Sequence, residues 1–322
     1  MTRCGTDAAP AERLARQAPS LAGESASISP ELFRKFQKLI YQEAGIWLAA
    51  HKTALLTGRL ARRVRLLGLS SMLEYYRLAT QADQQHERAV MIDCITTNET
   101  HFFREPRHFE LLAQRIFPLW KEQAAAGQRP ARIRIWSAGC STGEEPFSLA
   151  MLLLKHFAEQ PGWDLEILAT DISTRVLEKA RTATFPIERA KEIPRDYLLA
   201  YMLKGIHEEE GAMKACPELH KLVRFARVNL HADSYPVTGA FDLIFCRNVL
   251  IYFDQESKRK VVCGLLRHLA PSGMLFVGHS ENLNGVAPGV RSIVPTVYVK
   301  PGSDGKLLPG LLASRADAGG RF

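Results

Sequence analysis

The sequence predicts an α/β protein in which a mainly parallel sheet follows a small, all-helical unit. From about residue 132 onward, apolar strand patterns alternate with helical patterns, as in a parallel sheet covered by helices. Residues 133–147 combine a strand, a turn of small residues and a helix start, which is the form of the first unit of a nucleotide-binding sheet. Before them, residues 29–97 show apolar residues at helical spacing.

Bulk composition narrows the class of protein. The 322 residues fit one large or two medium domains, and the net charge of +8 favours an acidic partner: nucleic acid, an anionic membrane surface or an acidic protein. The six cysteines have no zinc or Cys-x-x-Cys spacing, which is typical of a reducing compartment. No apolar run approaches the ~20 residues that span a bilayer, and the N-terminus lacks an apolar signal segment. We therefore expect a cytoplasmic protein without direct membrane insertion.

The helical unit is expected over residues 27–98, after a disordered lead at residues 1–26 that lacks apolar periodicity. Ser29-Pro30-Glu31 reads as a helix cap, a first-turn proline and an acidic first turn. In the second helix, the side chains expected on the buried face are Leu56, Leu60, Val64 and Leu67. The helices predicted after the first are 52–67, 73–80 and 86–97.

The second helix also carries four arginines, Arg59, Arg62, Arg63 and Arg65, on and around the side opposite its leucines. One interpretation is a solvated polar face. The other is a docking surface for an acidic partner, because the planar arginine fork binds carboxylates and phosphates bidentately. No aromatic residues interleave with these arginines, which argues against single-stranded nucleic acid.

Residues 96–105, Thr-Thr-Asn-Glu-Thr-His-Phe-Phe-Arg-Glu, join this unit to the next and make a poor amphipathic helix. One interpretation is a helix start capped by Thr97 or Asn98. The alternative is a polar lip over a ligand site, to which Arg104 supplies a charge.

The α/β part is expected to contain an insertion at about residues 186–222, where no strand–helix–strand unit is visible, and to end in a flexible tail at 303–322. The predicted strands are 133–136, 165–170, 223–228, 241–245, 273–278 and a last edge strand, 296–300. The predicted helices are 145–157, 174–180 and 254–270.

The glycine turn at 139–143 matches neither the phosphate-binding P-loop nor the Gly-x-Gly-x-x-Gly pattern of dinucleotide sites. Asp171 ends the second strand, where an acid can hydrogen-bond ribose hydroxyls. An adenosine ligand without phosphates fits better, and S-adenosylmethionine is the common one. Glu145 has two interpretations. It can complete a capping box with Thr142, as Glu144 can with Ser141, or it can contact the ligand.

Two later strands end in polar residues. Asn229-Leu230 follows strand 223–228, and Arg247-Asn248 interrupts an apolar run after strand 241–245. Ligands in open α/β sheets bind at the carboxyl ends of the strands, so these residues should meet the glycine turn at one crevice.

Five motifs follow one another along the chain: Thr97-Asn98-Glu99-Thr100 with Phe102-Phe103-Arg104-Glu105, Trp136 to Pro146, Ala169-Thr170-Asp171-Ile172, Phe245 to Phe253, and Gly278-His279-Ser280-Glu281. In this order they resemble the CheR-type chemotaxis receptor methyltransferases, which are S-adenosylmethionine-dependent protein-glutamate O-methyltransferases. The resemblance covers residues 29–300 and implies a small all-α N-terminal domain, a Rossmann-like methyltransferase domain over about 99–302, and an inserted β-subdomain.

Carried over by position, the resemblance implies a set of residues that contact the methyl donor: Asn98, Thr100, Arg104, Glu145, Asp171, Asn229, Leu230, Arg247 and Asn248. Arg247 and Asn248 would lie near the reacting centre with Tyr252. We hypothesise that Arg104 anchors the donor and that Tyr252 orients the acceptor, although Tyr252 could instead be a core aromatic. His279 at a strand end is more often structural than catalytic.

The implied reaction explains why no general base is expected. A glutamate side chain has a pKa near ~4.3, so it is already an ionised nucleophile at neutral pH. In-line positioning and partial desolvation should then provide most of the acceleration. No metal is expected, and the product of the donor is S-adenosylhomocysteine.

The resemblance implies methylation of glutamates on the cytoplasmic helices of methyl-accepting chemotaxis receptors, which the arginine-rich helix would recognise. We expect a monomer that binds no nucleic acid. Two alternatives stay open: the same chemistry on a regulatory protein outside chemotaxis, and a catalytically silent module that senses S-adenosylmethionine. The presence of every pocket motif argues against the silent module.

Overall fold

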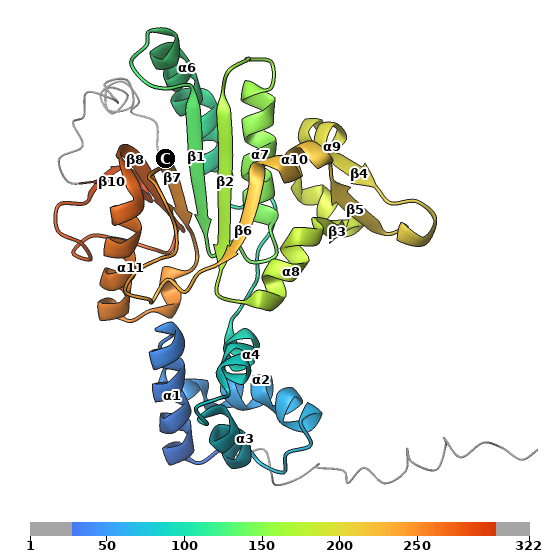
Figure 1. Cartoon of the computed structure of the whole chain (residues 1–322), viewed down its shortest axis with the longest axis vertical. Coiled ribbons are helices and arrows are strands. Elements are labelled where there is room, and N and C mark those ends of the chain that lie inside the picture. Colours follow the sequence, from blue (N-terminus) through green and yellow to red (C-terminus); the bar gives the residue numbers. More distant parts are fainter. Residues whose placement is uncertain (1–27, 301–322) are drawn as a thin grey trace, which may run out of the picture.

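A computed structural model of the chain describes residues 28–300. The predicted disordered lead and flexible tail lie outside the described residues. In Figure 1, a group of helices sits below an upright sheet, and a smaller lobe projects from one side of the sheet. The predicted fold class, a helical N-terminal unit followed by an α/β domain with an inserted β-subdomain, is therefore confirmed.

The N-terminal unit has four helices: α1 Pro30–Ala44, α2 Thr53–Leu66, α3 Met72–Ala79 and α4 Gln85–Ile95. A short 3₁₀ turn, Ala50–Lys52, precedes α2. The hydroxyl of Ser29 caps α1 by accepting a hydrogen bond from the backbone N–H of Leu32, as predicted. Leu56, Leu60 and Val64 are buried as predicted, but the prediction for Leu67 was wrong, because α2 ends at Leu66 and Leu67 is exposed.

The linker at residues 96–105 is not helical, so the first of its two interpretations, a helix start capped by Thr97 or Asn98, was wrong. The next helix begins at Pro106, a residue suited to a first helical turn. It runs through α5 Pro106–Leu111, a π-helical stretch at Leu112–Ile116 and α6 Phe117–Ala125. The sequence patterns had not predicted this helix.

The main sheet has seven strands in the order β6-β2-β1-β7-β8-β10-β9. Every pairing among β6, β2, β1, β7 and β8 is parallel, whereas β10 is antiparallel to both neighbours. The predicted edge strand at 296–300 was wrong in its place, because β9 lies outside β10. The strands are β1 Arg132–Ala138, β2 Asp164–Asp171, β6 Val223–Arg227, β7 Phe241–Cys246, β8 Leu269–Val277, β9 Arg291–Val294 and β10 Val297–Val299.

Both faces of this sheet are buried, because strand side chains alternate between two apolar cores. Ile133 and Ile135 of β1 belong to one core, and Trp136 belongs to the other. The main covering helices are α7 Glu144–Phe157, α8 Thr174–Thr182 and α11 Gln255–His268.

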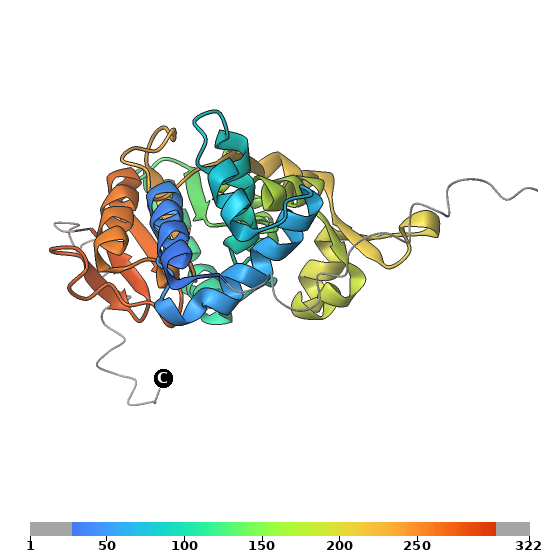
Figure 2. The ribbon, with the colours of Figure 1, turned by 90° about the horizontal axis from the view of Figure 1, so that it is seen from below.

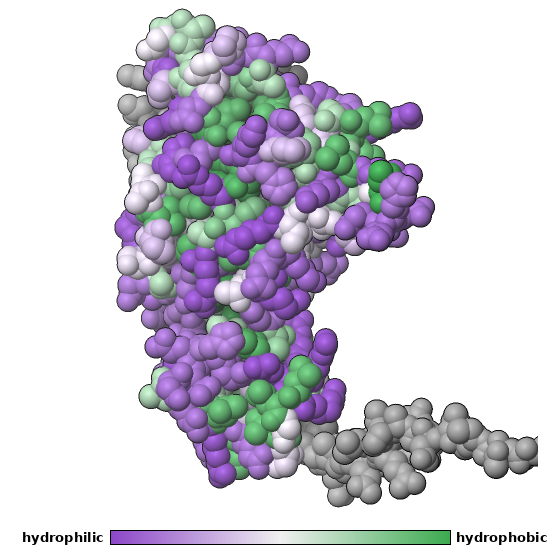
Figure 3. Space-filling view, turned by 45° about the vertical axis from the view of Figure 1, so that its right-hand side comes forward, coloured by the Kyte–Doolittle hydropathy of each residue, from purple (hydrophilic) through white to green (hydrophobic). Residues whose placement is uncertain are grey.

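The insertion forms its own small antiparallel sheet, with strand order β3-β5-β4. It begins at Thr184, two residues before the expected start, and it also contains helices. It projects from the body of the molecule in Figures 1 and 3. Its elements are β3 Thr184–Pro186, the 3₁₀ turn Ile187–Glu192, α9 Arg195–Tyr201, β4 Met202–Lys204, the 3₁₀ turn His207–Glu209, β5 Ala212–Ala215 and α10 Pro217–Leu222.

The N-terminal unit lies against the carboxyl ends of the parallel strands, and Figure 2 shows it from that side. Ile46 forms an isolated antiparallel bridge with Phe253. The hydroxyl of Tyr41 donates to Asp254 at 3.0 Å. These contacts hold the helical unit at the edge of the sheet where ligands bind in α/β folds. Within residues 28–300, no helix has the length and apolar character needed to cross a membrane.

Candidate functional site

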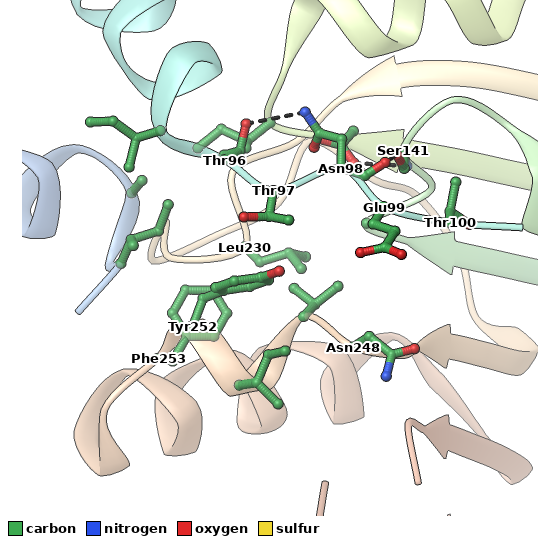
Figure 4. A pocket seen from close by; sticks show the side chains of 18 of the residues that line it. Thr96, Thr97, Asn98, Glu99, Thr100, Ser141, Leu230, Asn248, Tyr252 and Phe253 are labelled. Carbon is green, nitrogen blue, oxygen red and sulfur yellow. Dashed lines mark hydrogen bonds between the residues drawn. The ribbon is translucent and has the colours of Figure 1, made fainter. Parts of the chain in front are cut away.

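A cavity of about 540 Å³ lies between the N-terminal unit and the carboxyl edge of the sheet. Its walls come from the linker, the glycine turn, the ends of β2, β6 and β7, and the segment after α1. Figure 4 shows part of this lining. All of the site residues predicted from the sequence line it, namely Asn98, Thr100, Arg104, Glu145, Asp171, Asn229, Leu230, Arg247, Asn248 and Tyr252.

The glycine turn approaches the segment after β7 closely. Gly139 has φ +91°, and a Cβ atom built on it would lie 2.4 Å from a methyl group of Val249. Gly143, at φ +102°, precedes α7, which has no side-chain cap. A helix begins at the predicted place, but the capping-box interpretation of Glu144 and Glu145 was wrong. The Thr142 hydroxyl donates to the carboxylate of Glu144 instead.

Glu145 forms a buried ion pair with Arg247. Arg247 Nε donates to one carboxylate oxygen of Glu145 at 2.7 Å, and the Ser137 hydroxyl donates to the other at 2.6 Å. The side chains of Arg247 and Glu145 are only 2% and 10% exposed. Glu145 therefore links the start of α7 to the end of β7 at the floor of the cavity, which a helix-capping role would not do.

Arg247 also holds the linker and α5. Its Nη1 donates to the backbone carbonyl of Arg104 and to Nδ1 of His108 at 3.3 Å. Because Nδ1 of His108 accepts this hydrogen bond, Nε2 carries the proton and donates to the Thr296 hydroxyl at 2.8 Å. Burial, together with the charge of Arg247, lowers the pKa of His108 to about 3. His108 is thus a neutral part of this network.

Asp171 holds the loops on either side of it. Its two carboxylate oxygens accept backbone N–H groups from Ser141 at 2.9 Å and Ser173 at 3.0 Å. Burial raises the pKa of Asp171, although these hydrogen bonds act in the opposite direction. The hydroxyl of Ser141 donates to the backbone carbonyl of Asn98 at 2.9 Å, so the linker is tied to the glycine turn (Figure 4).

Asn229 connects the cavity to the N-terminal unit. Its side-chain nitrogen donates to the carbonyl of Glu43 at 2.7 Å, and its side-chain oxygen accepts the N–H of His231. The adjacent Leu230 is buried. The two residues thus form the cavity wall where the loop after β6 meets the end of α1.

Asn248 has a left-handed backbone, with φ +60°. Its N–H donates to Glu281 at 2.8 Å, and its side-chain oxygen is buried without a hydrogen-bond partner among the described residues. Glu281 also accepts the N–H groups of Gly278 and Ile251, and burial raises its pKa. The sequence analysis gave Glu281 no role of its own. The available signal was an acidic residue shortly after an apolar strand.

Arg104 lines the cavity from the linker, and Tyr252 lines it from the segment after β7. Arg104 is partly buried, and its guanidinium donates to the carbonyl of Glu99 at 3.1 Å. Tyr252 is half-buried and therefore is not a core aromatic. In Figure 4 its ring extends across the cavity below Leu230. Its hydroxyl has no hydrogen bond within the described part of the chain.

The sequence reasoning missed one wall of the cavity. The N-terminal unit contributes a set of mostly apolar residues with two cations: Ala44, Ile46, Trp47, Leu48, Lys52, Leu55 and Arg59. No local pattern marks this wall, because it forms only where the segment after α1 docks on residues 252–253.

His279 does not line the cavity. Its side chain is 55% exposed, and its N–H donates to Glu105 at 3.0 Å. Glu105, His108 and His279 place possible metal-ligand atoms within 4.8 Å of one another. Arg247 Nη1 already lies 3.7 Å from Glu105 Oε2, and its positive charge would repel a divalent ion at this position.

The four arginines of α2 differ in their surroundings. Arg63 forms a two-point ion pair with the buried Glu87. Arg59 donates to the carbonyl of Ile95 and to the hydroxyl of Thr97, which fixes the start of the linker. Arg62 and Arg65, by contrast, are exposed and have no hydrogen bond or ion pair within residues 28–300.

Comparison with known proteins gives matches along nearly the whole described chain. Residues 31–96 match the family model "CheR methyltransferase, all-alpha domain", and residues 98–299 match "CheR methyltransferase, SAM binding domain". A chemotaxis protein methyltransferase of Escherichia coli (strain K12) is 42% identical over 276 residues, covering 85% of this chain and 92% of the relative. Chemotaxis protein methyltransferase 2 of Pseudomonas aeruginosa is 38% identical, covering 87% and 96%. The chain therefore belongs to the CheR methyltransferase family.

Proposed function

We propose that this protein transfers the methyl group of S-adenosylmethionine to glutamate side chains on the cytoplasmic helices of methyl-accepting chemotaxis receptors. The products are glutamate methyl esters and S-adenosylhomocysteine. One observation carries the proposal: every residue that the family resemblance assigns to the donor lines a single cavity, and a cationic, apolar wall of the N-terminal unit closes the same cavity. Donor and acceptor can therefore meet in one place.

The residues present fit an adenosine-type donor. The cavity volume lies within the range of small-molecule sites. Each carboxylate oxygen of Asp171 accepts one backbone N–H and keeps a free lone pair for a ribose hydroxyl. Asn98, Thr100, Asn229 and Leu230 would enclose the remaining surface of the donor.

Bound here, the donor supplies a methyl group on a positively charged sulfur. The acceptor carboxylate is already ionised at neutral pH, so the protein need not move a proton. Its residues position and desolvate the reactants instead. Glu145 and Arg247 neutralise each other, which leaves a firm floor without an uncompensated charge that would hold the acceptor away from the methyl group.

Arg104 and Tyr252 are the residues to which we assign direct roles. The guanidinium of Arg104 has only one hydrogen bond among the described residues, so it can anchor a carboxylate of the donor. The Tyr252 ring crosses the cavity, and its hydroxyl, which has no partner among residues 28–300, can orient the acceptor carboxylate by donating one hydrogen bond.

Charge complementarity between acidic receptor helices and the arginines of α2 supports the receptor as the partner. Receptor methylation helices are acidic by family resemblance. The guanidinium groups of Arg62 and Arg65, which have no partner in the described part of the chain, suit carboxylates. Arg59 lies where α2 meets the cavity and completes the docking surface. Arg63 belongs to the ion pair with Glu87, so we assign it a structural role. The reaction takes place in the cytoplasm, where these receptor helices lie, and the enzyme acts as a monomer.

A methyl-transfer assay tests the proposal. Purified enzyme is incubated with methyl-labelled donor and the organism's own receptors. Base-labile label on receptor glutamates is the expected result. Label on a different protein in a cell extract would favour the non-chemotaxis alternative. Donor binding without transfer to any protein would favour a silent sensor.

A further inference from the structure

Two exposed apolar side chains, Trp47 and Ile251, come from different domains and line the same cavity. Trp47 follows α1 and is 52% exposed, and Ile251 follows β7 and is 50% exposed. The other large, exposed apolar side chains of the described residues do not line this cavity: Leu66, Leu67, Leu73, Leu199, Leu203 and Ile206. Exposed apolar surface beside a binding cavity is typical of an interaction site.

Backbone contacts across the domain boundary hold this pair in place. The N–H of Trp47 donates to the carbonyl of Tyr252 at 2.9 Å, beside the bridge between Ile46 and Phe253. The Trp47 ring packs edge-on against Tyr41, with centroids 6.2 Å apart and planes at 87°. The hydroxyl of Tyr41 is itself bonded to Asp254. The surface is therefore preformed, and it exists only while the two domains are docked.

The wall that the N-terminal unit contributes to the cavity carries positive charge. Lys52 and Arg59 line the cavity from the same N-terminal segment as Trp47, and residues 44–59 add no acidic side chain to the lining. A partner segment that enters here therefore meets apolar surface with cations next to it, which complements an acidic, amphipathic helix.

We propose that Trp47 and Ile251 form an acceptor platform, which packs against apolar side chains flanking the target glutamate on its helix. The inference rests on the proposed function. A glutamate side chain reaches into the cavity only if its helix lies across the mouth. Residues three and four positions away share that helix face and therefore fall on the rim. The apolar rim selects glutamates whose neighbours at these positions are apolar.

The test uses helical peptides of the receptor methylation region as acceptors, with apolar residues or serines at the positions three and four from the glutamate. The enzyme variants are Trp47→Ser and Ile251→Ser. The matched control is Leu73→Ser, an exposed leucine of α3 away from the cavity. Each variant should raise KM for the apolar-flanked peptide roughly 10-fold, whereas Leu73→Ser should leave it unchanged. Affinity for S-adenosylhomocysteine should not change in any variant.

Serine-flanked peptides separate recognition from damage to the fold. With wild-type enzyme, the serine-flanked peptide should have a KM roughly 10-fold higher than the apolar-flanked peptide. Trp47→Ser and Ile251→Ser should not raise the KM for the serine-flanked peptide any further. This peptide comparison also decides the matter if either serine variant fails to fold. Equal KM values for the two peptides with wild-type enzyme would overturn the platform while leaving methyl transfer intact. Failure of the wild-type enzyme to methylate any receptor helix would instead overturn the proposed function, and the platform with it.

Discussion

Arg247 donates a hydrogen bond from Nε to Glu145 across 2.7 Å and thereby joins the end of β7 to the first turn of α7. The same guanidinium reaches the backbone carbonyl of Arg104 in the linker. One buried side chain thus sets the relative positions of three segments that line the cavity. Glu145 also accepts a hydrogen bond from the hydroxyl of Ser137 in β1. The ion pair of Arg247 and Glu145 is therefore connected to both β1 and β7.

Removing the negative charge of Glu145 should weaken both the fold and the donor site. Glu145→Gln takes a counterion from the buried Arg247, and breaking a buried ion pair in this way costs on the order of 3 kcal/mol. We expect a lower free energy of unfolding in urea and weaker binding of S-adenosylhomocysteine by calorimetry. Glu110→Gln, at an exposed position of α5, is the control. Unchanged donor affinity in Glu145→Gln would mean that Glu145 has no part in the donor site.

Replacing Arg104 should affect the donor more than the fold. The guanidinium is partly exposed, and its one hydrogen bond among the described residues is to the carbonyl of Glu99. Arg104→Ala should therefore unfold at nearly the same urea concentration as the wild type. We expect affinity for S-adenosylmethionine to fall roughly 10-fold, the loss expected for one charge-assisted hydrogen bond. Arg107→Ala, at an exposed neighbouring position, should have no effect. If Arg104→Ala changed neither donor affinity nor turnover, its assignment as the donor anchor would fail.

Tyr252→Phe keeps the ring that crosses the cavity and removes only the hydroxyl. If the hydroxyl orients the acceptor carboxylate, kcat/KM for the receptor should fall roughly 10-fold with unchanged donor affinity. Steady-state methyl transfer and calorimetry measure the two quantities separately. Tyr76→Phe in the N-terminal unit serves as the control. Full activity of Tyr252→Phe would exclude the hydroxyl from the mechanism.

Regular patterns made most of the fold predictable. The helices of the N-terminal unit and the parallel strands follow from apolar periodicity, which depends on residues close in sequence. The predicted site residues share one cavity because the carboxyl ends of parallel strands meet at one edge. This rule brings Asp171, Asn229 and Arg247 together although they are far apart in the chain.

What sequence could not predict depends on long-range partners. The cavity wall after α1 forms through the bridge from Ile46 to Phe253, which leaves no local pattern. The ion pair of Arg63 with Glu87 joins residues 24 positions apart, so Arg63 looked like part of a free basic surface. The capping boxes failed because the N-cap residue of α7 is Gly143, which has no side chain, and neither Ser141 nor Thr142 occupies that position. Strand β9 has the sequence Arg-Ser-Ile-Val, which shows neither an alternating nor a continuous apolar pattern, so the sequence did not predict it.

Reversing the charge of Arg62 or Arg65 should weaken receptor methylation. Both side chains are exposed and unpaired within the described residues, so Arg62→Glu or Arg65→Glu should raise KM for the receptor and leave donor affinity and stability unchanged. The effect should shrink at high salt, because exposed charges are screened beyond ~8 Å at physiological ionic strength. Arg132→Glu is the control. It makes the same change in charge at the amino end of β1, away from the cavity, and should leave KM for the receptor unchanged.

The matched variant at Arg63 should behave differently. Arg63→Glu places a second carboxylate beside Glu87, so it should lower the free energy of unfolding whether or not a receptor is present. Docking by the α2 surface would be contradicted if Arg62→Glu and Arg65→Glu methylated receptors with the wild-type KM at low salt.

The buried imidazole of His108 should make stability depend on pH. Its pKa is about 3 in the folded protein and about 6.5 in an unfolded chain. Between these values the unfolded state binds a proton that the folded state does not, so stability is lost as pH falls below 6.5. From pH 7 to pH 5 this group alone should remove about 2 kcal/mol. His108→Gln should flatten that part of the profile in urea denaturation, whereas His51→Gln, at an exposed position, should not. If the wild type and His108→Gln lost the same free energy of unfolding between pH 7 and pH 5, then burial and the charge of Arg247 would not lower the pKa of His108 in the folded protein.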